Sequence, residues 1–337
     1  MAIKIAINGF GRIGRATFKS ILKNHPHLEV VAINDLTSPG VLAHLLKYDS
    51  IYGAYEKVVK FDQENLIING QKIKVLSEEN PAELPWKSLK IDIVLECTGV
   101  FRDLKGAQQH IKAGAKKVII SAPAKGDNIP CFVLGANEEK YNPEKDNIVD
   151  MGSCTSNCLT PIVEILDREL GIISGSMTTV HSYTNDQKIL DLPHKDLRRA
   201  RAAGMNIILT STGAITAVER IYPHLKGKLN GLAIRVPTPV VSVIDLVCNV
   251  KKETNAQEVN YFFKKASGTV EYRNILGIED ALLVSTDYVG NTYSAIVDAE
   301  STKVINNNLV KVLAWYDNEW AYSCRLAEFA EFIGRKL

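Results

Sequence analysis

The sequence predicts a doubly wound α/β domain followed by an α+β domain with a mostly antiparallel sheet. The chain has 337 residues, and single hydrophobic cores stop growing at about 250 to 300 residues, so two domains are expected. Strand-like and helix-like patterns alternate up to Asp150, and longer strand-like patterns dominate after it. We therefore expect a first domain at residues 1–150 and a second domain at residues 151–318.

The first half opens with a strand, a glycine turn, a helix and a second strand. Apolar Ile3–Ile7 precedes the turn, a helical pattern covers Arg12–Lys23, and the β-rich segment LEVVAIN follows. Two more strands are expected at Ile91–Gly99 and Lys116–Ser121, with a helix around Ala107–Ala113 between them. Repeated strand–helix–strand units of this kind predict a parallel sheet.

The second half has a different pattern. A helix is expected to begin near Cys154, and strands are expected in GLAIRVPTPVVSVIDLVCNV, ALLVSTDYV and LVKVLAWYD. Turns such as VINNNLV are typical of antiparallel pairing. The closing segment, residues 319–337, spaces Leu326, Phe329 and Phe332 helically and carries basic residues in its predicted last turn. We expect this helix to pack on the first domain.

Composition and charge exclude several classes of protein. The chain is 46% hydrophobic and 23% charged, which is ordinary for folded proteins and unlike disordered or collagenous chains. A net charge of +2 does not indicate a nucleic-acid or membrane partner. Neither a leader pattern nor a run of 18 apolar residues is present, which favours a cytoplasmic location. Six cysteines in a chain this long favour reduced thiols over a disulfide framework.

The glycine turn GFGRIG matches the GxGxxG pattern of dinucleotide-binding, Rossmann-type domains. Gly9 would permit the tight turn, Gly11 would let a pyrophosphate approach the backbone, and Gly14 would let helix and strand pack closely. Free amides at the start of the helix would attract the phosphates. An isolated motif of this kind is often only a turn, but here it follows a strand and opens a helix.

Asp35 stands about twenty residues after the glycine turn, at the end of the next strand. A carboxylate at this position accepts hydrogen bonds from an adenosine ribose and repels a 2′-phosphate. The sequence therefore predicts NAD rather than NADP as cofactor.

Cys154 is the candidate nucleophile, because it stands where an apolar helical pattern begins, with Ile162, Ile165 and Leu166 at helical spacing. Unpaired amides and the helix dipole at that position are expected to lower the pKa of the thiol. Cys158 lies one turn further and is expected to be buried and inert. A lone cysteine is more often a small core residue, and the cysteine pair lacks the second ligand pair of a zinc site, so no metal is predicted.

His181 is the candidate base. It ends the β-rich run SMTTVH and is followed by polar residues, which would hold the imidazole at a strand end facing a cleft. Taken alone it is as compatible with a hydrogen-bonded structural histidine as with a catalytic one. The other histidines lie in helical or loop-like stretches.

Ten motifs spread along the chain resemble the phosphorylating glyceraldehyde-3-phosphate dehydrogenases in order and spacing. They run from Gly9 to Trp320 and are GFGRIG, KYDS, ECTG, SCTSNC, HSYTNDQ, DLPHKDLRRARAA, TSTGA, KGKLNG, RVPTP and WYDNEW. The resemblance implies that Cys154 attacks an aldehyde while His181 takes the proton, that a hydride passes to NAD, and that inorganic phosphate cleaves the resulting thioester. The substrate would be glyceraldehyde 3-phosphate and the product 1,3-bisphosphoglycerate.

The same resemblance implies a role for further residues. Arg199 and Arg235, with Thr184 and Asp186, would bind the substrate phosphate. Inorganic phosphate would be held by Ser153, Thr155, Thr212 and Gly213. Asn318 would hold the nicotinamide carboxamide, and the remaining cofactor-binding residues would be Asn8, Gly9, Gly11, Arg12, Ile13, Gly14, Asp35, Thr98, Ser121 and Tyr322.

The basic stretch HKDLRRARAA would ordinarily be a solvated loop. The resemblance instead implies a loop that crosses a subunit interface of a homotetramer. Leu192 and Pro193 in this loop match the NAD-using members, which agrees with Asp35. Some positions depart from the usual family text and are expected to affect phosphate affinity and oxidation: Asp150, Met151, Gly152, Ser156, Leu209 and Cys324.

Two alternatives stay open from the sequence. Erythrose-4-phosphate dehydrogenases share the cysteine, the histidine and the cofactor fold, although TSTGA keeps the glyceraldehyde-3-phosphate form. A non-catalytic binding protein on the same fold is the other alternative, and the intact pair of Cys154 and His181 argues against it.

Overall fold

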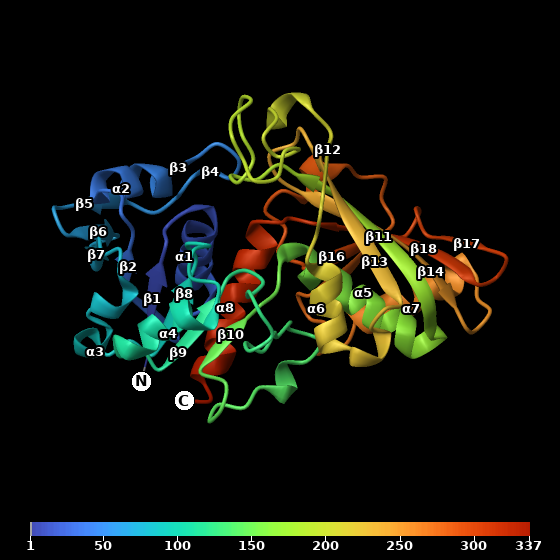
Figure 1. Cartoon of the computed structure of the whole chain (residues 1–337), viewed down its shortest axis with the longest axis horizontal. Helices are drawn as coiled ribbons and strands as arrows, with labels where there is room; N and C mark the ends of the chain where they lie inside the picture. Colours follow the sequence, from blue (N-terminus) through green and yellow to red (C-terminus); the bar gives the residue numbers. More distant parts are fainter. Residues whose placement is uncertain (1) are drawn as a thin grey trace. The chain divides into compact units, whose positions relative to one another are not determined.

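The computed structural model describes residues 2–337 and divides them into two compact units. The first unit contains residues 1–132, 139–152 and 323–337, and the second contains residues 133–138 and 153–322. Each unit is built around one large sheet, as Figure 1 shows. The C-terminal segment from Ser323 onward therefore folds with the N-terminal sheet.

The first unit is a doubly wound α/β fold, as predicted. Its sheet has the order β10-β9-β8-β1-β2-β7-β6-β5, and pairing is parallel from β10 to β7 and antiparallel from β7 to β5. The strands are β1 (Ile3–Asn8), β2 (Leu28–Asn34), β5 (Val59–Phe61), β6 (Asn65–Ile68), β7 (Gln71–Leu76), β8 (Ile93–Glu96), β9 (Lys117–Ile120) and β10 (Ile148–Asp150), and a separate small hairpin joins β3 (Tyr48–Asp49) to β4 (Gly53–Ala54).

Helices cover both faces of this sheet. The helices are α1 (Arg12–Asn24), α2 (Pro39–Lys47), α3 (Trp86–Leu89) and α4 (Leu104–Lys112), with α8 (Trp320–Gly334) at the end of the chain. Side chains alternate along β1: Ala6 shares a core cluster with Trp86 of α3 and Ala107 of α4, whereas Gly14 of α1 lies against Ile7. Gly334 of α8 is close to Ile3, so α8 covers the same face as α1.

The second unit is built on a mostly antiparallel sheet, which confirms the predicted α+β class. The sheet has the order β12-β13-β11-β14-β18-β16-β15, with β17 paired to β18, and only β11–β13 and β15–β16 are parallel. Its strands are β11 (Ile172–Ser182), β12 (Ile208–Thr210), β13 (Leu229–Val236), β14 (Ser242–Val250), β15 (Leu276–Glu279), β16 (Ala295–Asp298), β17 (Lys303–Ile305) and β18 (Leu309–Tyr316).

Three helices pack together in this unit: α5 (Cys154–Leu170), α6 (Ala214–Ile221) and α7 (Ala256–Ser267). The central helix α5 contacts α6, α7 and the strands β14, β16 and β18. Residues Cys158, Leu159, Ile162 and Ile165 of α5 are fully buried, which is the apolar face that the helical spacing predicted. In Figure 1 the long loop after β11 lies at the opposite end of this sheet from α7.

Two expectations about local structure are wrong. ALLVSTDYV is not a strand, because it contains a short 3-10 helix at Ser285–Tyr288, and its Thr286 and Asp287 favour a turn over a ladder. The basic residues Arg335 and Lys336 lie beyond the end of α8 at Gly334 rather than in its last turn. The asparagine-rich turn between β17 and β18 is confirmed, with Asn306 and Asn307 both at positive φ.

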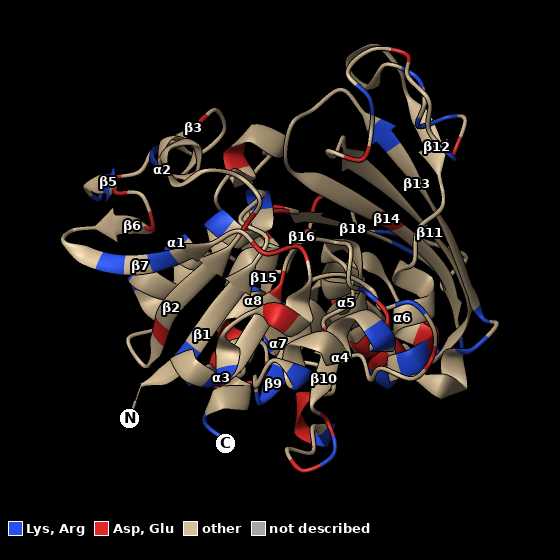
Figure 2. Cartoon of the chain, turned by 60° about the vertical axis from the view of Figure 1, so that its left-hand side comes forward, with Lys and Arg blue, Asp and Glu red and all other residues tan. Residues whose placement is uncertain are grey.

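Charged residues of both signs are interspersed along each unit, as Figure 2 shows. This distribution matches the small net charge of +2. Within residues 2–337, none of the helices has the length and apolar character that crossing a membrane would demand.

Candidate active site and cofactor cavity

The first unit contains a cavity of about 490 Å³ at the carboxyl ends of its parallel strands. Ligands of doubly wound sheets bind at this edge, where the strand order reverses about the first strand. The wall is formed by residues that follow β1, β2, β7 and β8: Asn8, Gly9, Gly11, Asn34, Asp35, Leu36, Glu78, Glu79, Cys97, Thr98, Val100 and Phe101. Five of the residues predicted to bind the cofactor therefore share one cavity.

The glycine turn contributes main-chain atoms to the wall of this cavity. Gly9 has φ +91, and a Cβ atom there would lie 2.7 Å from the Thr98 amide nitrogen. A Cβ atom on Gly14 would lie 2.2 Å from the Gly9 carbonyl oxygen, which explains the need for glycine where α1 approaches the turn. A Cβ atom on Gly11 would meet no atom within 4 Å. Gly11 is also the N-cap of α1 and supplies no side-chain cap, so the amides of the first turn face open space that suits a pyrophosphate.

Asp35 is oriented by two backbone amides. Its Oδ2 accepts a hydrogen bond from the Phe10 amide at 2.8 Å, and its Oδ1 accepts one from the Thr37 amide at 3.0 Å. The carboxylate is held at the rim of the cavity beside Leu36 and Glu78. These groups fit the adenosine end of a dinucleotide and disfavour an additional phosphate on the ribose.

Cys154 and His181 lie together in the second unit, although 27 positions separate them. Cys154 is the first residue of α5, and His181 is the penultimate residue of β11. The Cys154 Sγ atom is 3.5 Å from the His181 Nε2 atom. The other ring nitrogen, Nδ1, is 2.7 Å from the Ser182 carbonyl oxygen. This arrangement of nucleophile, imidazole and orienting group is the geometry that covalent catalysis requires.

The pKa shift of the Cys154 thiol differs from the one that the sequence predicted. Burial raises the pKa of the Cys154 thiol, while the charge of Arg235 and hydrogen bonds from Thr155 act in the opposite direction. Burial and the charge of Arg235 lower the pKa of His181 to about 3. The expected lowering of the thiol pKa is wrong, because burial outweighs the helix terminus. Both shifts favour the uncharged forms of the two groups in the free protein.

Arg235 is placed next to His181 by strand pairing. The two residues are register partners in the parallel pair β11–β13. The Arg235 guanidinium contacts His181 Nδ1 and donates to the Ser182 carbonyl oxygen at 2.9 Å. Tyr316 lies on another side of the imidazole, with ring centroids 6.0 Å apart. Its hydroxyl bonds to Thr155 and Thr179 at 2.9 and 2.8 Å.

Asn318 is held by two serine hydroxyls. Its Oδ1 accepts hydrogen bonds from Ser182 Oγ at 2.8 Å and from Ser242 Oγ at 3.0 Å. Ser242 Oγ also accepts a hydrogen bond from the Ser182 amide at 3.2 Å. Because both hydroxyls donate to the amide oxygen, the amide NH₂ of Asn318 is directed away from them and serves as a donor.

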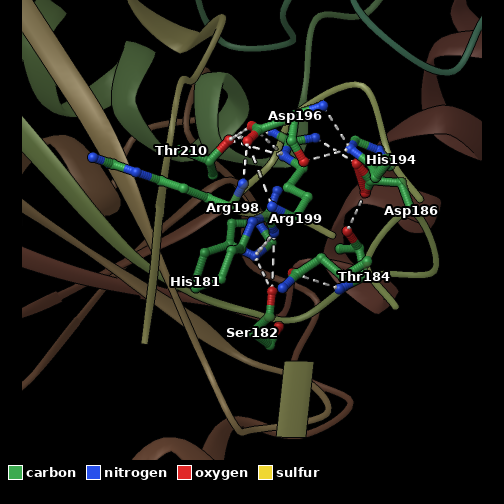
Figure 3. A network of polar contacts seen from close by, with 11 residues as sticks. His181, Ser182, Thr184, Asp186, His194, Asp196, Arg198, Arg199 and Thr210 are labelled. Atoms are coloured by element: carbon green, nitrogen blue, oxygen red, sulfur yellow. Dashed lines mark hydrogen bonds and ion pairs between the residues drawn. The ribbon is translucent and has the colours of Figure 1, made fainter. Parts of the chain in front are cut away.

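A network of charged and hydroxyl side chains fills the loop after β11, as Figure 3 shows. Asp186 forms an ion pair with Arg199 and accepts a hydrogen bond from Thr184 Oγ1 at 3.0 Å. Arg199 also donates to Thr210 Oγ1, at 2.8 Å from Nε and 2.6 Å from Nη2. Burial is the largest single influence and raises the pKa of Asp186, but the Arg199 charge and the hydrogen bonds from Thr184 and Arg199 together lower it below its usual value. The predicted substrate-phosphate residues Thr184, Asp186 and Arg199 therefore lie in one network.

The predicted inorganic-phosphate residues stand at two helix N-termini. Ser153 caps α5 by accepting a hydrogen bond from the Ser156 amide, and Ser156 Oγ accepts one from the Ser153 amide at 2.7 Å. Thr212 Oγ1 accepts a hydrogen bond from the Ala214 amide, and Gly213 is the N-cap of α6. Helix N-termini are suited to anions. The Thr155 hydroxyl, in contrast, is engaged by Tyr316.

Comparison with known proteins decides the family. Residues 3–104 match the model of the glyceraldehyde 3-phosphate dehydrogenase NAD binding domain, and residues 153–318 match the model of the C-terminal domain of the same enzymes. The chain belongs to the glyceraldehyde-3-phosphate dehydrogenase family. Glyceraldehyde-3-phosphate dehydrogenase of Geobacillus stearothermophilus is 53% identical over 336 residues, covering 100% of this chain and 99% of the relative.

Other members of the family are similarly close. The enzyme named glyceraldehyde-3-phosphate dehydrogenase 2 in Nostoc sp. PCC 7120 is 51% identical over 99% of both chains. The enzyme named glyceraldehyde-3-phosphate dehydrogenase in Streptomyces coelicolor is 48% identical over the full length of both chains. The predictions of an NAD-dependent dehydrogenase and of NAD as cofactor are confirmed by the family and by its NAD-binding domain.

The residues that depart from the usual family pattern are accommodated by local contacts. Ser156 supplies the hydroxyl of the α5 capping box. Asp150 is fully buried, and its Oδ1 accepts a hydrogen bond from the Gly152 amide at 2.7 Å. Cys324 is buried with its sulfur 3.7 Å from Ser20 Oγ, whereas Leu209 in β12 is exposed. Burial of Cys324 gives oxidants little access to this thiol.

Several site residues were not found by reasoning on the sequence. Glu78 and Glu79 line the cofactor cavity because β7 pairs with β2, and the strands β5 to β7 were not anticipated. Ser242 and Tyr316 are register partners in β14 and β18, and neither stands in a local motif that points to its contact. Among the predicted cofactor residues, Arg12 instead pairs with Asp49 at 2.7 Å, and Ser121 lies outside the cavity wall.

Proposed function

We propose that this enzyme oxidises glyceraldehyde 3-phosphate with NAD and inorganic phosphate to 1,3-bisphosphoglycerate. The observation that carries the proposal is the 3.5 Å separation of Cys154 Sγ and His181 Nε2 at the start of α5. Together with the Arg199 and Asp186 network, it supports a thiol nucleophile, a base and a binding site for a phosphorylated aldehyde.

His181 acts as the base that moves the thiol proton. With the ring proton on Nδ1, where it is donated to the Ser182 carbonyl, Nε2 is free to take the proton of Cys154. The Arg235 guanidinium, which can only donate, contacts the same Nδ1 and opposes this tautomer. As Sγ bonds to the aldehyde carbon, the proton passes through Nε2 to the substrate oxygen and a thiohemiacetal forms. The pKa of this imidazole, lowered to about 3, favours release of the proton to the substrate oxygen and opposes its uptake from the thiol.

NAD, when bound, supplies the hydride acceptor for oxidation of the thiohemiacetal to a thioester. His181 takes the hydroxyl proton released in this step. The open space beside Gly11 and the oriented carboxylate of Asp35 fit the pyrophosphate and the adenosine ribose. We propose that the cofactor is held by Asn8, Gly9, Gly11, Arg12, Ile13, Gly14, Asp35, Thr98, Ser121, Asn318 and Tyr322.

Inorganic phosphate then attacks the thioester carbon. The acyl phosphate leaves, the C–S bond breaks, and the Cys154 thiolate recovers its proton from His181. We propose that the attacking phosphate is bound by Ser153, Thr155, Thr212 and Gly213, and that the substrate phosphate is bound by Thr184, Asp186, Arg199 and Arg235. The helix N-termini and the arginine side chains support these two assignments.

We further propose a cytoplasmic homotetramer in which residues 1–150 and the C-terminal helix bind NAD and residues 151–318 carry the chemistry. The loop after β11 exposes large apolar side chains, with Ile189 at 88% and Leu197 and Met205 at 82%. Exposed apolar groups of this size mark interaction surfaces. Size-exclusion chromatography with light scattering measures the mass directly, and a stable monomer would contradict the tetramer.

The function is tested by following NADH absorbance with glyceraldehyde 3-phosphate, with and without inorganic phosphate. Parallel assays use erythrose 4-phosphate as substrate or NADP as cofactor. We expect turnover with glyceraldehyde 3-phosphate and NAD to depend on phosphate and to exceed the other combinations. Faster turnover with erythrose 4-phosphate, or phosphate-independent turnover, would contradict the proposal.

A further inference from the structure

A buried polar cluster lies behind the wall of the cofactor cavity and takes no part in the chemistry proposed above. Its members are Trp86, His110 and Glu96, which are all 0 to 1% exposed. Trp86 belongs to α3, His110 to α4 and Glu96 to the end of β8. A buried carboxylate is costly unless several donors surround it, so the cluster needs a reason beyond packing.

The Trp86 indole fixes which ring nitrogen of His110 donates a hydrogen bond and which accepts one. The Trp86 indole can only donate, and its Nε1 lies 3.0 Å from His110 Nδ1. Nδ1 is therefore an acceptor, and the imidazole proton resides on Nε2, which donates to Glu96 Oε2 at 3.0 Å. A proton on Nδ1 would place two N–H groups against each other. The indole thus fixes the tautomer in which His110 is a donor to Glu96.

Donors from the cavity wall converge on the same Glu96 carboxylate. Asn8 Nδ2 donates to Glu96 Oε2 at 2.6 Å, which leaves Asn8 Oδ1 to accept from Asn34 Nδ2 at 2.7 Å. Asn34 forms two hydrogen bonds with the Glu78 backbone, both at 2.9 Å. Its Nδ2 donates to the Glu78 carbonyl oxygen, and its Oδ1 accepts from the Glu78 amide. Glu96 Oε1 also accepts from the amide and the hydroxyl of Thr98. Asn8, Asn34, Glu78 and Thr98 all line the cavity.

We propose that His110 and Trp86 are positioning residues for NAD binding. The donor on His110 Nε2 holds the Glu96 carboxylate, and Glu96 fixes Thr98 and the amide orientations of Asn8 and Asn34. The segment containing Glu78, at the rim beside Asp35, is thereby held in the geometry that receives the dinucleotide. The inference rests on NAD binding and is independent of the reaction at Cys154.

The test measures the Kd for NAD by calorimetry on the full-length, unliganded protein. Gln offers a donor that replaces imidazole Nε2, whereas Leu offers only apolar volume. We expect His110→Gln to bind NAD within about threefold of the parent and His110→Leu to bind about tenfold more weakly, because Leu leaves Glu96 short of a donor. A purely structural role predicts the opposite order, since Leu suits an apolar core better than Gln. Equal affinity of the two variants, or parental affinity of folded His110→Leu, would overturn the proposal.

A second pair of variants covers the case in which substitution of His110 prevents folding. Trp86→Phe keeps the aromatic ring and removes its donor, and Trp315→Phe removes a similar bond, from Nε1 to Asp298 at 3.1 Å, in the other unit. We expect the Kd for NAD to rise about threefold or more in Trp86→Phe and to stay parental in Trp315→Phe. An unchanged Kd in folded Trp86→Phe would overturn the proposal, as would ¹⁵N spectra that place the His110 proton on Nδ1. If the parent itself did not bind NAD, the proposed function would fail instead.

Discussion

The cofactor cavity and the thiol site are built in different ways. The cavity is built from residues at strand ends, and its central feature is the glycine turn, where Gly11 leaves the backbone uncovered. The thiol site is built from side chains on α5, β11, β13 and β18, where burial raises the pKa of the partly buried Cys154 thiol and lowers that of the buried His181 imidazole. The cofactor cavity depends on the missing side chain of a glycine, whereas burial and neighbouring charge set the reactivity of the thiol site.

This difference predicts that substitutions in the thiol site change the rate while those in the glycine turn change binding. The largest effect is expected for Cys154→Ser, which should lower kcat by roughly 10⁴-fold or more, because no other group can form the acyl intermediate. NADH formation under saturating substrate measures it. The matched control is Cys158→Ala, one turn further along α5 and fully buried, which should stay near parental kcat. A Cys154→Ser enzyme with near-parental turnover would remove the assignment of the nucleophile.

The next effect concerns the base. His181→Asn keeps a donor for the Ser182 carbonyl and removes the Nε2 acceptor. We expect kcat to fall by about 10² to 10⁴, with little change in the Kd for NAD, because the loss is confined to proton transfer. Turnover and calorimetry on the same preparation separate the two quantities. A loss of NAD affinity that accounts for the whole decrease in rate would refute the role of His181 as base.

The two sites also differ in how much of them the sequence predicts. Gly9, Gly11 and Asp35 belong to one strand–turn–helix–strand unit, so local spacing was sufficient to place them in one cavity. Arg235 reaches His181 only through the pairing of β11 with β13, and the resemblance to a family supplied it. The doubly wound fold followed from alternating patterns.

What the sequence could not predict depends on burial and on long-range pairing. Ser242 approaches Asn318 because β14 and β18 are adjacent. The raised pKa of Cys154 depends on burial that no local pattern reveals. The helix terminus at Cys154 was correctly located, but its effect on the pKa was overestimated.

Substitutions of Gly11 and Gly14 should have different effects, one on NAD binding and the other on stability. Gly14→Ala should destabilise the fold, because the new Cβ would lie 2.2 Å from the Gly9 carbonyl oxygen. Gly11→Ala should leave Tm unchanged, since no atom lies within 4 Å of its Cβ, while the methyl group occupies space needed by the pyrophosphate. We expect the Kd for NAD of Gly11→Ala to rise about tenfold. Thermal unfolding and calorimetry check both variants, and parental NAD affinity in Gly11→Ala would place the pyrophosphate elsewhere.

The smallest effect concerns the electrostatics of the second site. Arg235 lowers the pKa of both Cys154 and His181, so Arg235→Met should raise both. The rate of Cys154 alkylation by iodoacetamide, followed against pH by mass spectrometry, should rise towards a plateau above the ordinary thiol range in the parent. In Arg235→Met the curve should move to still higher pH, lowering the rate at pH 8 several-fold, because one pKa unit corresponds to about tenfold in thiolate population. A shift to lower pH would show that Arg235 does not stabilise the thiolate.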